Sequence, residues 1–330
     1  MWLFAVNPYF SKNFGAFLLL FFERMGELVL GKIGFKDLAS DEIQVLVLIL
    51  LAFSSALIGT FLVLKKLTML ANSLSHTVLL GIIVAYLLLI PFLPEGEVHA
   101  HSISVHVLLI ASLATGLITT VLTQLCTHLF KLQEDASTGL VFTTLFALGI
   151  VLATVFTRNT HLGTEAIMGN VDALHVHDLK LILGIAVFDF AVIALFFKEF
   201  KMTTFDAPFA SAQGVSGVFF NYLLMVLTSA TVIGSFRAVG VLLVLAFLVG
   251  PVLTARLFTH RLKKLIFLAC AIGMGASIVS VALSRHLLSV HHLPISTSGL
   301  SATVLGVIYF MGLIIKSIIS RLRARNQSVN

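Results

Sequence analysis

Long apolar blocks follow one another along most of the chain and are separated by short polar stretches. By inspection there are nine, at roughly residues 43–64, 70–93, 104–130, 138–157, 179–198, 218–236, 239–258, 264–284 and 298–319. An α-helix needs about 20 residues to cross the hydrocarbon core of a bilayer, and most of the blocks are close to that length. The pattern therefore predicts an all-α, polytopic membrane protein with about nine transmembrane helices.

A different pattern precedes the first block. Between residues 14 and 30 the apolar side chains fall near one helical face, while Glu23, Arg24 and Glu27 interrupt the stretch. This arrangement is typical of an amphipathic helix that lies at the membrane interface. A spanning helix is the alternative, although three charges in one span would be costly. We accordingly divide the chain into an N-terminal extracytoplasmic or interfacial segment (1–42), a transmembrane domain (43–320) and a basic tail (321–330).

Composition supports one membrane domain. Of the 330 residues, 58% are apolar and 11% are charged, whereas soluble domains carry about 25% charged residues. Cys126 and Cys270 lie in separate apolar blocks and predict no disulfide framework. The net charge of +6 does not form a patch that would indicate nucleic acid.

The basic residues instead indicate topology. If the Lys65–Lys66 pair is cytoplasmic, 13 of the 21 Lys and Arg residues lie in cytoplasmic segments, against 4 in outer segments after the first block. Because cytoplasmic loops are enriched in Lys and Arg, this bias predicts a first span that runs inward and a cytoplasmic C-terminus.

Histidines show the opposite bias, since 9 of 12 fall in the predicted outer segments. They are either neutral interfacial side chains or ligands for metal ions on the outer side of the membrane. The second reading is chemically reasonable because imidazole commonly binds zinc and iron. His99 and His101, in the loop Glu95–His106, are the best candidates for outer metal contacts.

A polar cluster begins the second apolar block. The block reaches spanning length only if Asn72, Ser75 and His76 enter the bilayer. Asn72 and His76 are four residues apart and share one helix face. Polar groups within a membrane usually face a protein interior or a water-filled path, so these residues are candidates for a translocation path. Packing of His76 between helices is the alternative.

Asp189 lies at the centre of the fifth block. An intramembrane carboxylate indicates either a functional site or an Asp that hydrogen-bonds to a neighbouring helix. The run Gly26–Lys32 fits GxxxxGK, but Ile33 follows where a phosphate loop needs Ser or Thr. We therefore expect energy to come from a partner or from an ion gradient.

The run Lys65–Gly81 resembles the Ser-His-…-Gly segment of permease subunits of ABC importers for manganese, zinc and iron ions. The chain keeps Ser75, His76 and Gly81. It has Asn72 where the family commonly has aspartate and Leu80 where the family has proline. The loss of a carboxylate at Asn72 removes a charged oxygen ligand from the pattern.

A second run, Phe205–Val215, is similar to the Ala-x-x-x-Gly loop that ABC importers dock into their ATPase subunit. The resemblance implies a cytoplasmic coupling helix in the loop 199–217. Local chemistry agrees, because Asp206 can cap a helix, Pro208 suits a first turn and a glycine can end it. The residues assigned to coupling are Phe205, Asp206, Phe209, Ala210 and Gly214. An ordinary capped loop helix is the alternative.

A third run, Arg237–Arg256, looks like the family's Val-Gly-x-Leu-Leu-Val-…-Pro signature. Pro251 cannot donate a backbone hydrogen bond, so Gly250 and Pro251 predict either a helix hinge or a passive kink.

The resemblance implies a permease subunit of an ATP-driven importer for divalent transition metals in the bacterial cytoplasmic (inner) membrane. It also implies three partners, namely a cytoplasmic ATP-binding subunit, an extracytoplasmic metal-binding protein and a second permease subunit, identical or paralogous. We expect no enzymatic activity, no permanently bound cofactor and no nucleic acid. Manganese, zinc and iron all stay open as the cargo. The alternatives are an ion-coupled secondary transporter that uses Asp189 and an ABC permease for a metal chelate.

Overall fold

The computed structural model describes residues 7–10, 12–32, 34, 37–89, 105–156 and 171–327. Within these residues the chain is helical and forms no β-strand. The elements are α1 (Phe14–Val29), α2 (Ser40–Leu64), α3 (Thr68–Leu89), α4 (Val105–Leu129), α5 (Glu134–Phe156), η3 (Val171–Ala173), α7 (Val176–Leu195), α8 (Phe197–Phe205), α9 (Ala207–Ala212), α10 (Gly217–Val239), α11 (Val241–Phe258), α12 (Leu262–His291) and α13 (Thr297–Gln327).

A helix lies at each of the apolar blocks that the sequence predicts. In the described part of the chain, five helices are long and apolar enough to cross a membrane: α2, α5, α10, α12 and α13. The pair α7 and α8, bent by 70°, would be a sixth. The apolar parts of α4 and α11 are shorter, at Ala114–Thr127 and Leu242–Phe258. An integral membrane protein is therefore confirmed, while nine spans stay a prediction.

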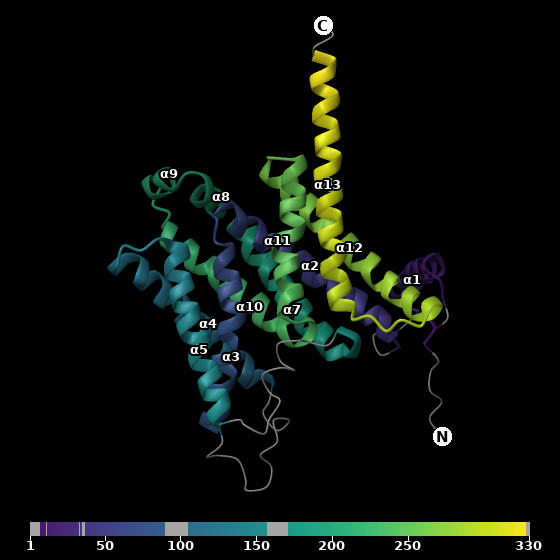
Figure 1. Ribbon diagram of the computed structural model, residues 1–330, viewed down its shortest axis with the longest axis horizontal. Coiled ribbons are helices and arrows are strands. Elements are labelled where there is room, and N and C mark those ends of the chain that lie inside the picture. Colours follow the sequence, from purple (N-terminus) through teal and green to yellow (C-terminus); the bar gives the residue numbers. More distant parts are fainter. Residues whose placement is uncertain are drawn as a thin grey trace. The chain divides into compact units, whose positions relative to one another are not determined.

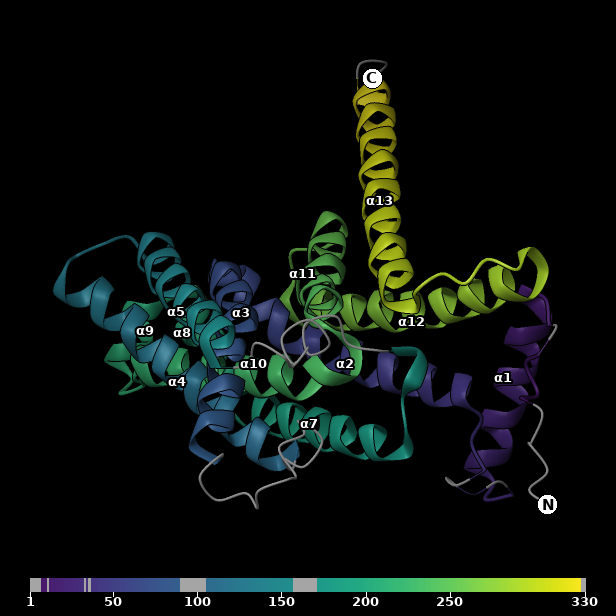
Figure 2. The same ribbon diagram turned by 60° about the horizontal axis from the view of Figure 1, so that its bottom comes forward.

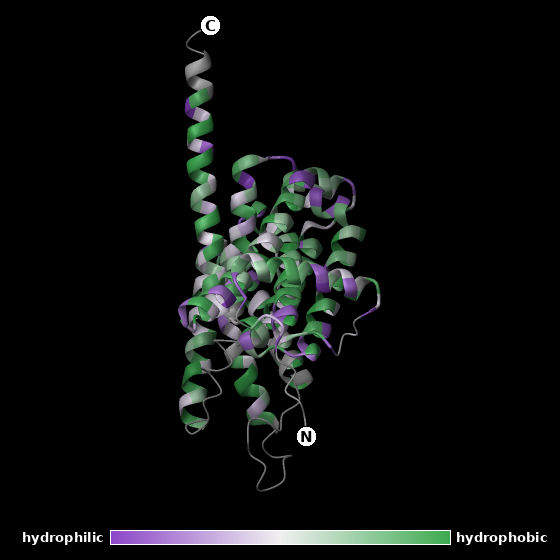
Figure 3. Ribbon diagram, turned by 90° about the vertical axis from the view of Figure 1, so that its right-hand side faces the viewer, coloured by the Kyte–Doolittle hydropathy of each residue, from purple (hydrophilic) through white to green (hydrophobic). Residues whose placement is uncertain are grey.

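Two boundaries differ from the prediction in an informative way. The fifth block was expected to end in a loop near residue 198, but the chain bends after Leu195 and continues as α8. The last helix continues through the basic residues to Gln327, because no proline or glycine follows Gly312 to end it. Hydrophobic residues cover most of the long helices (Figure 3).

The chain forms two compact units that interleave along the sequence. Unit 1 comprises Met1–Thr60, Asn170–Val187 and Ala246–Asn330, and unit 2 comprises Phe61–Gly169 and Phe188–Leu245. Both units contain parts of the helix α2, whose first residues belong to unit 1 and whose last turn belongs to unit 2.

Close helix packing holds unit 1 together. At Gly59 on α2 an added methyl group would overlap the backbone of Leu248 on α11, so only glycine fits there. The hydroxyl of Ser277 on α12 donates to the carbonyl of Leu48 on α2 at 3.2 Å. The start of α13 also packs on α12, and α1 lies beside α12 (Figures 1 and 2).

In unit 2, the helices α3, α4, α5 and α10 pack as a bundle. Leu74 and Met225 are buried together in its core. Gly116 on α4 lets the side chain of Ser229 on α10 approach closely, since an added Cβ would lie 3.0 Å from its oxygen. This bundle positions the polar cluster of α3, and α8 and α9 precede α10 at one end of it.

The N-terminal segment forms the expected helix α1, with Phe17 and Phe21 buried. One of its charges is engaged inside the protein, because the guanidinium of Arg24 forms an ion pair with the fully buried Glu42 of α2. Attachment of this segment to the transmembrane domain thus involves a buried charge pair as well as apolar contact.

Candidate functional site

The imidazole of His76 lies on α3 against two aromatic rings of α5. Its ring centroid is 5.3 Å from that of Phe142 and 5.5 Å from that of Phe146. The two Phe rings are one helical turn apart and stack at 5.8 Å. His76 is half-buried, so α5 covers the imidazole only in part.

Asn72 lies one turn before His76 on the same helix and is also half-buried. The side chain of Ser75 lies outside the described residues. Their neighbours Ser73 and Thr77 are buried, and the Thr77 hydroxyl donates to the carbonyl of Leu74 at 3.2 Å. The structure therefore keeps a short polar stretch within the packed bundle, as the sequence pattern predicts.

The side chain of Asp189 is fully buried on α7. Its Oδ2 accepts a hydrogen bond of 2.7 Å from the hydroxyl of Thr231 on α10. Asp189 and Thr231 both belong to unit 2, and this contact is the alternative of an Asp that hydrogen-bonds to a neighbouring helix. Among the described residues, no group of three or more His, Cys, Asp or Glu side chains could hold a metal ion.

The loop 199–217 has the local geometry that its sequence predicts. The carboxylate of Asp206 caps α9 by accepting from the backbone N–H of Phe209 at 3.0 Å. Gly214 follows the helix with φ 77°, a left-handed conformation that favours glycine. Phe205 and Phe209 are 58% and 50% exposed. The loop thus presents two aromatic side chains around a short, capped helix.

Behind the loop, a cluster of aromatic rings packs against α8. The ring of Phe200 is fully buried and lies 5.3 Å from both Phe61 at the end of α2 and Phe220 at the start of α10. Beside the cluster, the amine of Lys65 donates to Asn221 Oδ1 at 2.6 Å and to Thr203 Oγ1 at 3.3 Å. Burial lowers the pKa of Lys65 to about 8.

Sequence reasoning missed this use of Lys65, because the Lys65–Lys66 pair served only as a marker of topology. The signal that could have revealed it is weak. Thr203 and Asn221 are isolated polar residues that lie 138 and 156 positions from Lys65 in the chain.

Pro251 lies inside α11, which is assigned as one helix from Val241 to Phe258. The proline is buried, and a Cβ added at Gly273 of α12 would lie 3.4 Å from its ring. The hydroxyl of Thr254 donates to the carbonyl of Gly250 at 2.9 Å. A separate break in the helical path occurs at Gly240, with φ 85°, between α10 and α11.

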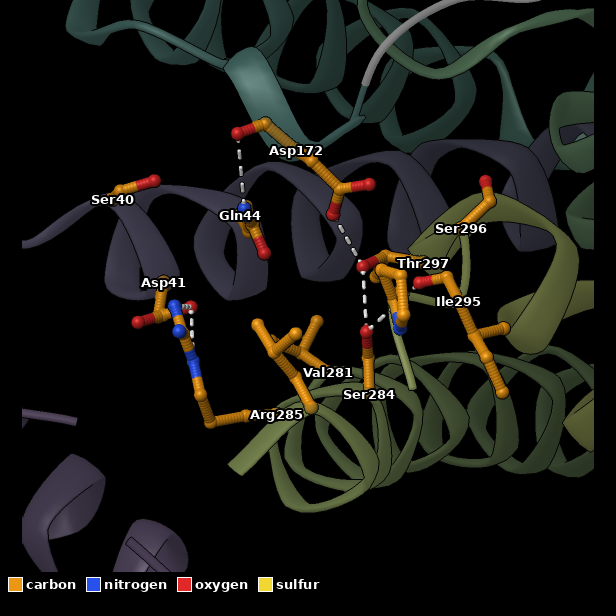
Figure 4. A pocket seen from close by; sticks show the side chains of 12 residues that line it. Ser40, Asp41, Gln44, Asp172, Val281, Ser284, Arg285, Ile295, Ser296 and Thr297 are labelled. Carbon is orange, nitrogen blue, oxygen red and sulfur yellow. Dashed lines mark hydrogen bonds and ion pairs between the residues drawn. The ribbon is translucent and has the colours of Figure 1, made fainter. Parts of the chain in front are cut away.

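A polar pocket of about 390 Å³ lies in unit 1 and was not predicted (Figure 4). Asp41 on one wall forms an ion pair with Arg285 and accepts from Asn7 Nδ2 at 2.6 Å. On another wall, Asp172 accepts from the hydroxyl of Thr297 at 2.5 Å. These carboxylates are engaged by neighbouring side chains, so the pocket has fixed polar walls. The predicted outer contacts His99 and His101 lie outside the described residues.

Comparison with known proteins agrees with this architecture. The chain is 38% identical over 305 residues to the "Probable metal transport system membrane protein" of Chlamydia muridarum, a match that covers 92% of this chain and 93% of that protein. It is 34% identical over 274 residues to the "Manganese transport system membrane protein MntD" of Bacillus subtilis, which covers 79% of this chain and 87% of that protein.

Among solved structures, the fold is similar to a chain of "PsaBC from Streptococcus pneumoniae in complex with Fab". The TM-score is 0.67 at 23% identity, over 89% of this chain and 95% of that chain. The sequence profile of the ABC 3 transport family matches residues 43–316, from the first apolar block almost to the end of the last. The chain therefore belongs to the ABC 3 transport family.

Proposed function

We propose that this chain is the permease subunit of an ATP-driven importer that moves a divalent transition-metal ion, manganese first among the candidates, across the bacterial cytoplasmic membrane. The names of its relatives, which specify metal transport and manganese transport, support this cargo. Zinc and iron are the other candidates. The chain acts as a transport component, and an ion-coupled mechanism that uses Asp189 is not favoured.

One observation in the structure supports ATP hydrolysis by a partner subunit as the energy source. The helix α9 is capped by Asp206, ended near Gly214 and flanked by the exposed rings of Phe205 and Phe209. Exposed aromatic anchors on a short, rigid element suit insertion into a groove of a partner protein. We assign this loop, 199–217, to docking with a cytoplasmic ATP-binding subunit.

The proposed path runs past the polar stretch of α3. Neutral imidazole and amide groups at His76 and Asn72 offer weak ligands for a passing divalent ion, and Ser75 belongs to the same stretch. Weak sites suit transport, because the ion has to leave them again. We assign Asp189 to the lining of the path as a source of charge, and Gly250 and Pro251 to a hinge in α11.

The complete importer would contain further subunits. An extracytoplasmic metal-binding protein would deliver the ion, and a second permease subunit, a copy or a paralogue, would complete the pore. With Lys65–Lys66 on the cytoplasmic side, the C-terminus is cytoplasmic and the start of α2 is on the outer side. His99 and His101 would then lie outside, and we expect uptake to survive their joint replacement by alanine.

Uptake of radioactive manganese in a cell that lacks its own manganese importer tests the proposal. Expression of the chain with its partner subunits should restore uptake. Gly214→Val should insert normally but hydrolyse ATP without transport, because valine is strained at a positive φ. Gly31→Val is the matched control, since Gly31 also has a positive φ, 71°, and open space around it but lies outside this loop. Normal coupling in Gly214→Val would contradict the docking role.

His76→Ala tests the path in the same cell. It should lower uptake sharply at normal membrane insertion, whereas His260→Ala, at an exposed residue between α11 and α12, should leave uptake unchanged. Wild-type uptake by His76→Ala would assign His76 to packing against α5.

A further inference from the structure

Lys65 joins three elements of unit 2 at one point. It directly follows the last residue of α2, and its amine reaches Thr203 on α8 and Asn221 on α10. The hydroxyl of Thr203 donates its own hydrogen to the carbonyl of Phe200 at 3.2 Å, which leaves its oxygen available to accept from Lys65. A single side chain therefore connects α8, which leads directly into α9, with two long helices of the transmembrane domain.

The surrounding aromatic rings restrain these three helices mainly against separation. Phe61, Phe200 and Phe220 bring α2, α8 and α10 into apolar contact. Apolar contact is less directional than a hydrogen bond, so it resists separation of the helices more strongly than small shifts along them. Hydrogen bonds depend strongly on distance and angle, so the bonds of Lys65 fix where α8 lies along the other two helices.

The chemistry of the two acceptors also matters. An amide and a hydroxyl satisfy the amine without a carboxylate, and burial lowers its pKa because these neutral groups replace water only in part. A half-buried cation with neutral acceptors is held less tightly than one in a buried ion pair. Such a contact can move together with the elements that it joins.

We propose that Lys65 is a positioning residue that transmits displacement of the coupling loop, through Thr203 and Asn221, to the ends of α2 and α10. The inference rests on the proposed docking of α9 with the ATP-binding subunit. Movement of α9 pulls α8, and the bonded amine makes the two long helices follow. Without it, α8 slides over the aromatic rings and the displacement is lost.

The test uses the complete importer, purified and reconstituted in liposomes, with manganese ions as the transported probe. The measured quantity is manganese transported per ATP hydrolysed. Lys65→Met keeps the apolar stem and removes the donor. We expect it to assemble and hydrolyse ATP at a rate near wild type, with transport per ATP at least about fivefold lower, the lower end of typical coupling between sites.

Three further variants make the result specific. Lys66→Met removes the same charge at the adjacent, exposed lysine and should behave as wild type. Lys65→Arg restores a donor that can reach both acceptors and should recover most of the coupling. Thr203→Val removes one acceptor at constant size, should lose part of the coupling and should add nothing to Lys65→Met.

Wild-type transport per ATP in Lys65→Met would overturn the inference. If Lys65→Met fails to assemble, Thr203→Val and Asn221→Leu provide the test. Wild-type transport per ATP in both of these variants would overturn the inference. Gly214→Val separates the two proposals. If it uncouples transport while Lys65→Met does not, only the role of Lys65 is wrong. If Gly214→Val is itself fully coupled, docking of the loop is wrong.

Discussion

Charged side chains lie at both ends of α2, buried at the first end and half-buried at the other, and the structure satisfies them differently. At the first end, in unit 1, Asp41 and Glu42 form ion pairs with Arg285 and Arg24. At the other end, in unit 2, Lys65 has an amide and a hydroxyl as acceptors. One end uses opposite charges and the other uses neutral dipoles.

The two arrangements differ in how firmly they hold each end of α2. Glu42 accepts from Arg24, from the hydroxyl of Tyr9 at 2.8 Å and from the backbone N–H of Ala39 at 2.7 Å. The pKa of Tyr9 is raised by its burial and by this carboxylate. Removing one member of such a network leaves a buried charge uncompensated, which is strongly destabilising. We therefore interpret the first end as an anchor and the second as a contact that can move.

The largest expected effect breaks the anchor. Glu42→Gln should lower the free energy of unfolding by about 3–5 kcal/mol, because Arg24 and Tyr9 lose a charged acceptor. Thermal unfolding of the purified protein in detergent measures this loss. Glu23→Gln, at an exposed residue of α1, is the control and should change stability little. A loss equal to that of the control would mean that the network does not anchor α1.

A smaller effect is expected at the neighbouring pair. Asp41→Asn should cost about 2 kcal/mol, since Asp41 accepts from two side chains, Asn7 and Arg285, whereas Glu42 accepts from three groups. Combining it with Arg285→Met in a double-mutant cycle measures the pair itself. The expected coupling is about 0.5–3 kcal/mol, and additive losses would show that the two side chains stabilise the protein independently.

Lys65→Met sharpens the comparison at the other end of α2. Methionine keeps an apolar stem and removes a buried charge, while Asn221 loses a donor. These effects oppose each other, so the net change in unfolding free energy should be about 1 kcal/mol or less. The same thermal unfolding experiment applies. A loss as large as that of Glu42→Gln would make Lys65 an anchor, and the contrast between the two ends would fail.

The smallest effect concerns pH. The pKa of Lys65 is lowered from 10.5 to about 8 in the folded protein, so between these values the unfolded chain binds more protons. The cost of burying the charged amine is therefore fully present below pH 8 and fades as the pH rises. The melting temperature of the wild type relative to Lys65→Met should increase from pH 7 to pH 9.5. A decrease would contradict the direction of the pKa shift.

Local signals in the sequence were sufficient for much of the fold. Apolar blocks located the long helices because burial in a membrane requires continuous apolar runs. Asp206 and Gly214 located α9 because capping depends on residues a few positions apart. Family resemblance, carried by Ser75 and His76, led to the correct family.

Contacts between distant residues could not be predicted in this way. Arg285 lies 244 positions from Asp41, and no periodicity links them. The hydrogen bond between Asp189 and Thr231 and the rings beside His76 likewise depend on how helices pack. The bend between α7 and α8 occurs without proline or glycine, so no helix-breaking residue in the sequence predicted it.

The acidic pair at the start of α2 also makes the family-matched region depend on residues outside it. The family match begins at residue 43, directly after Asp41 and Glu42. Asn7, Tyr9 and Arg24, which donate to these carboxylates, all lie before it. A chain shortened to the start of α2 would keep Arg285 beside Asp41 but would leave the buried Glu42 without Tyr9 and Arg24. The boundary of the sequence family is therefore not a boundary of the folded unit.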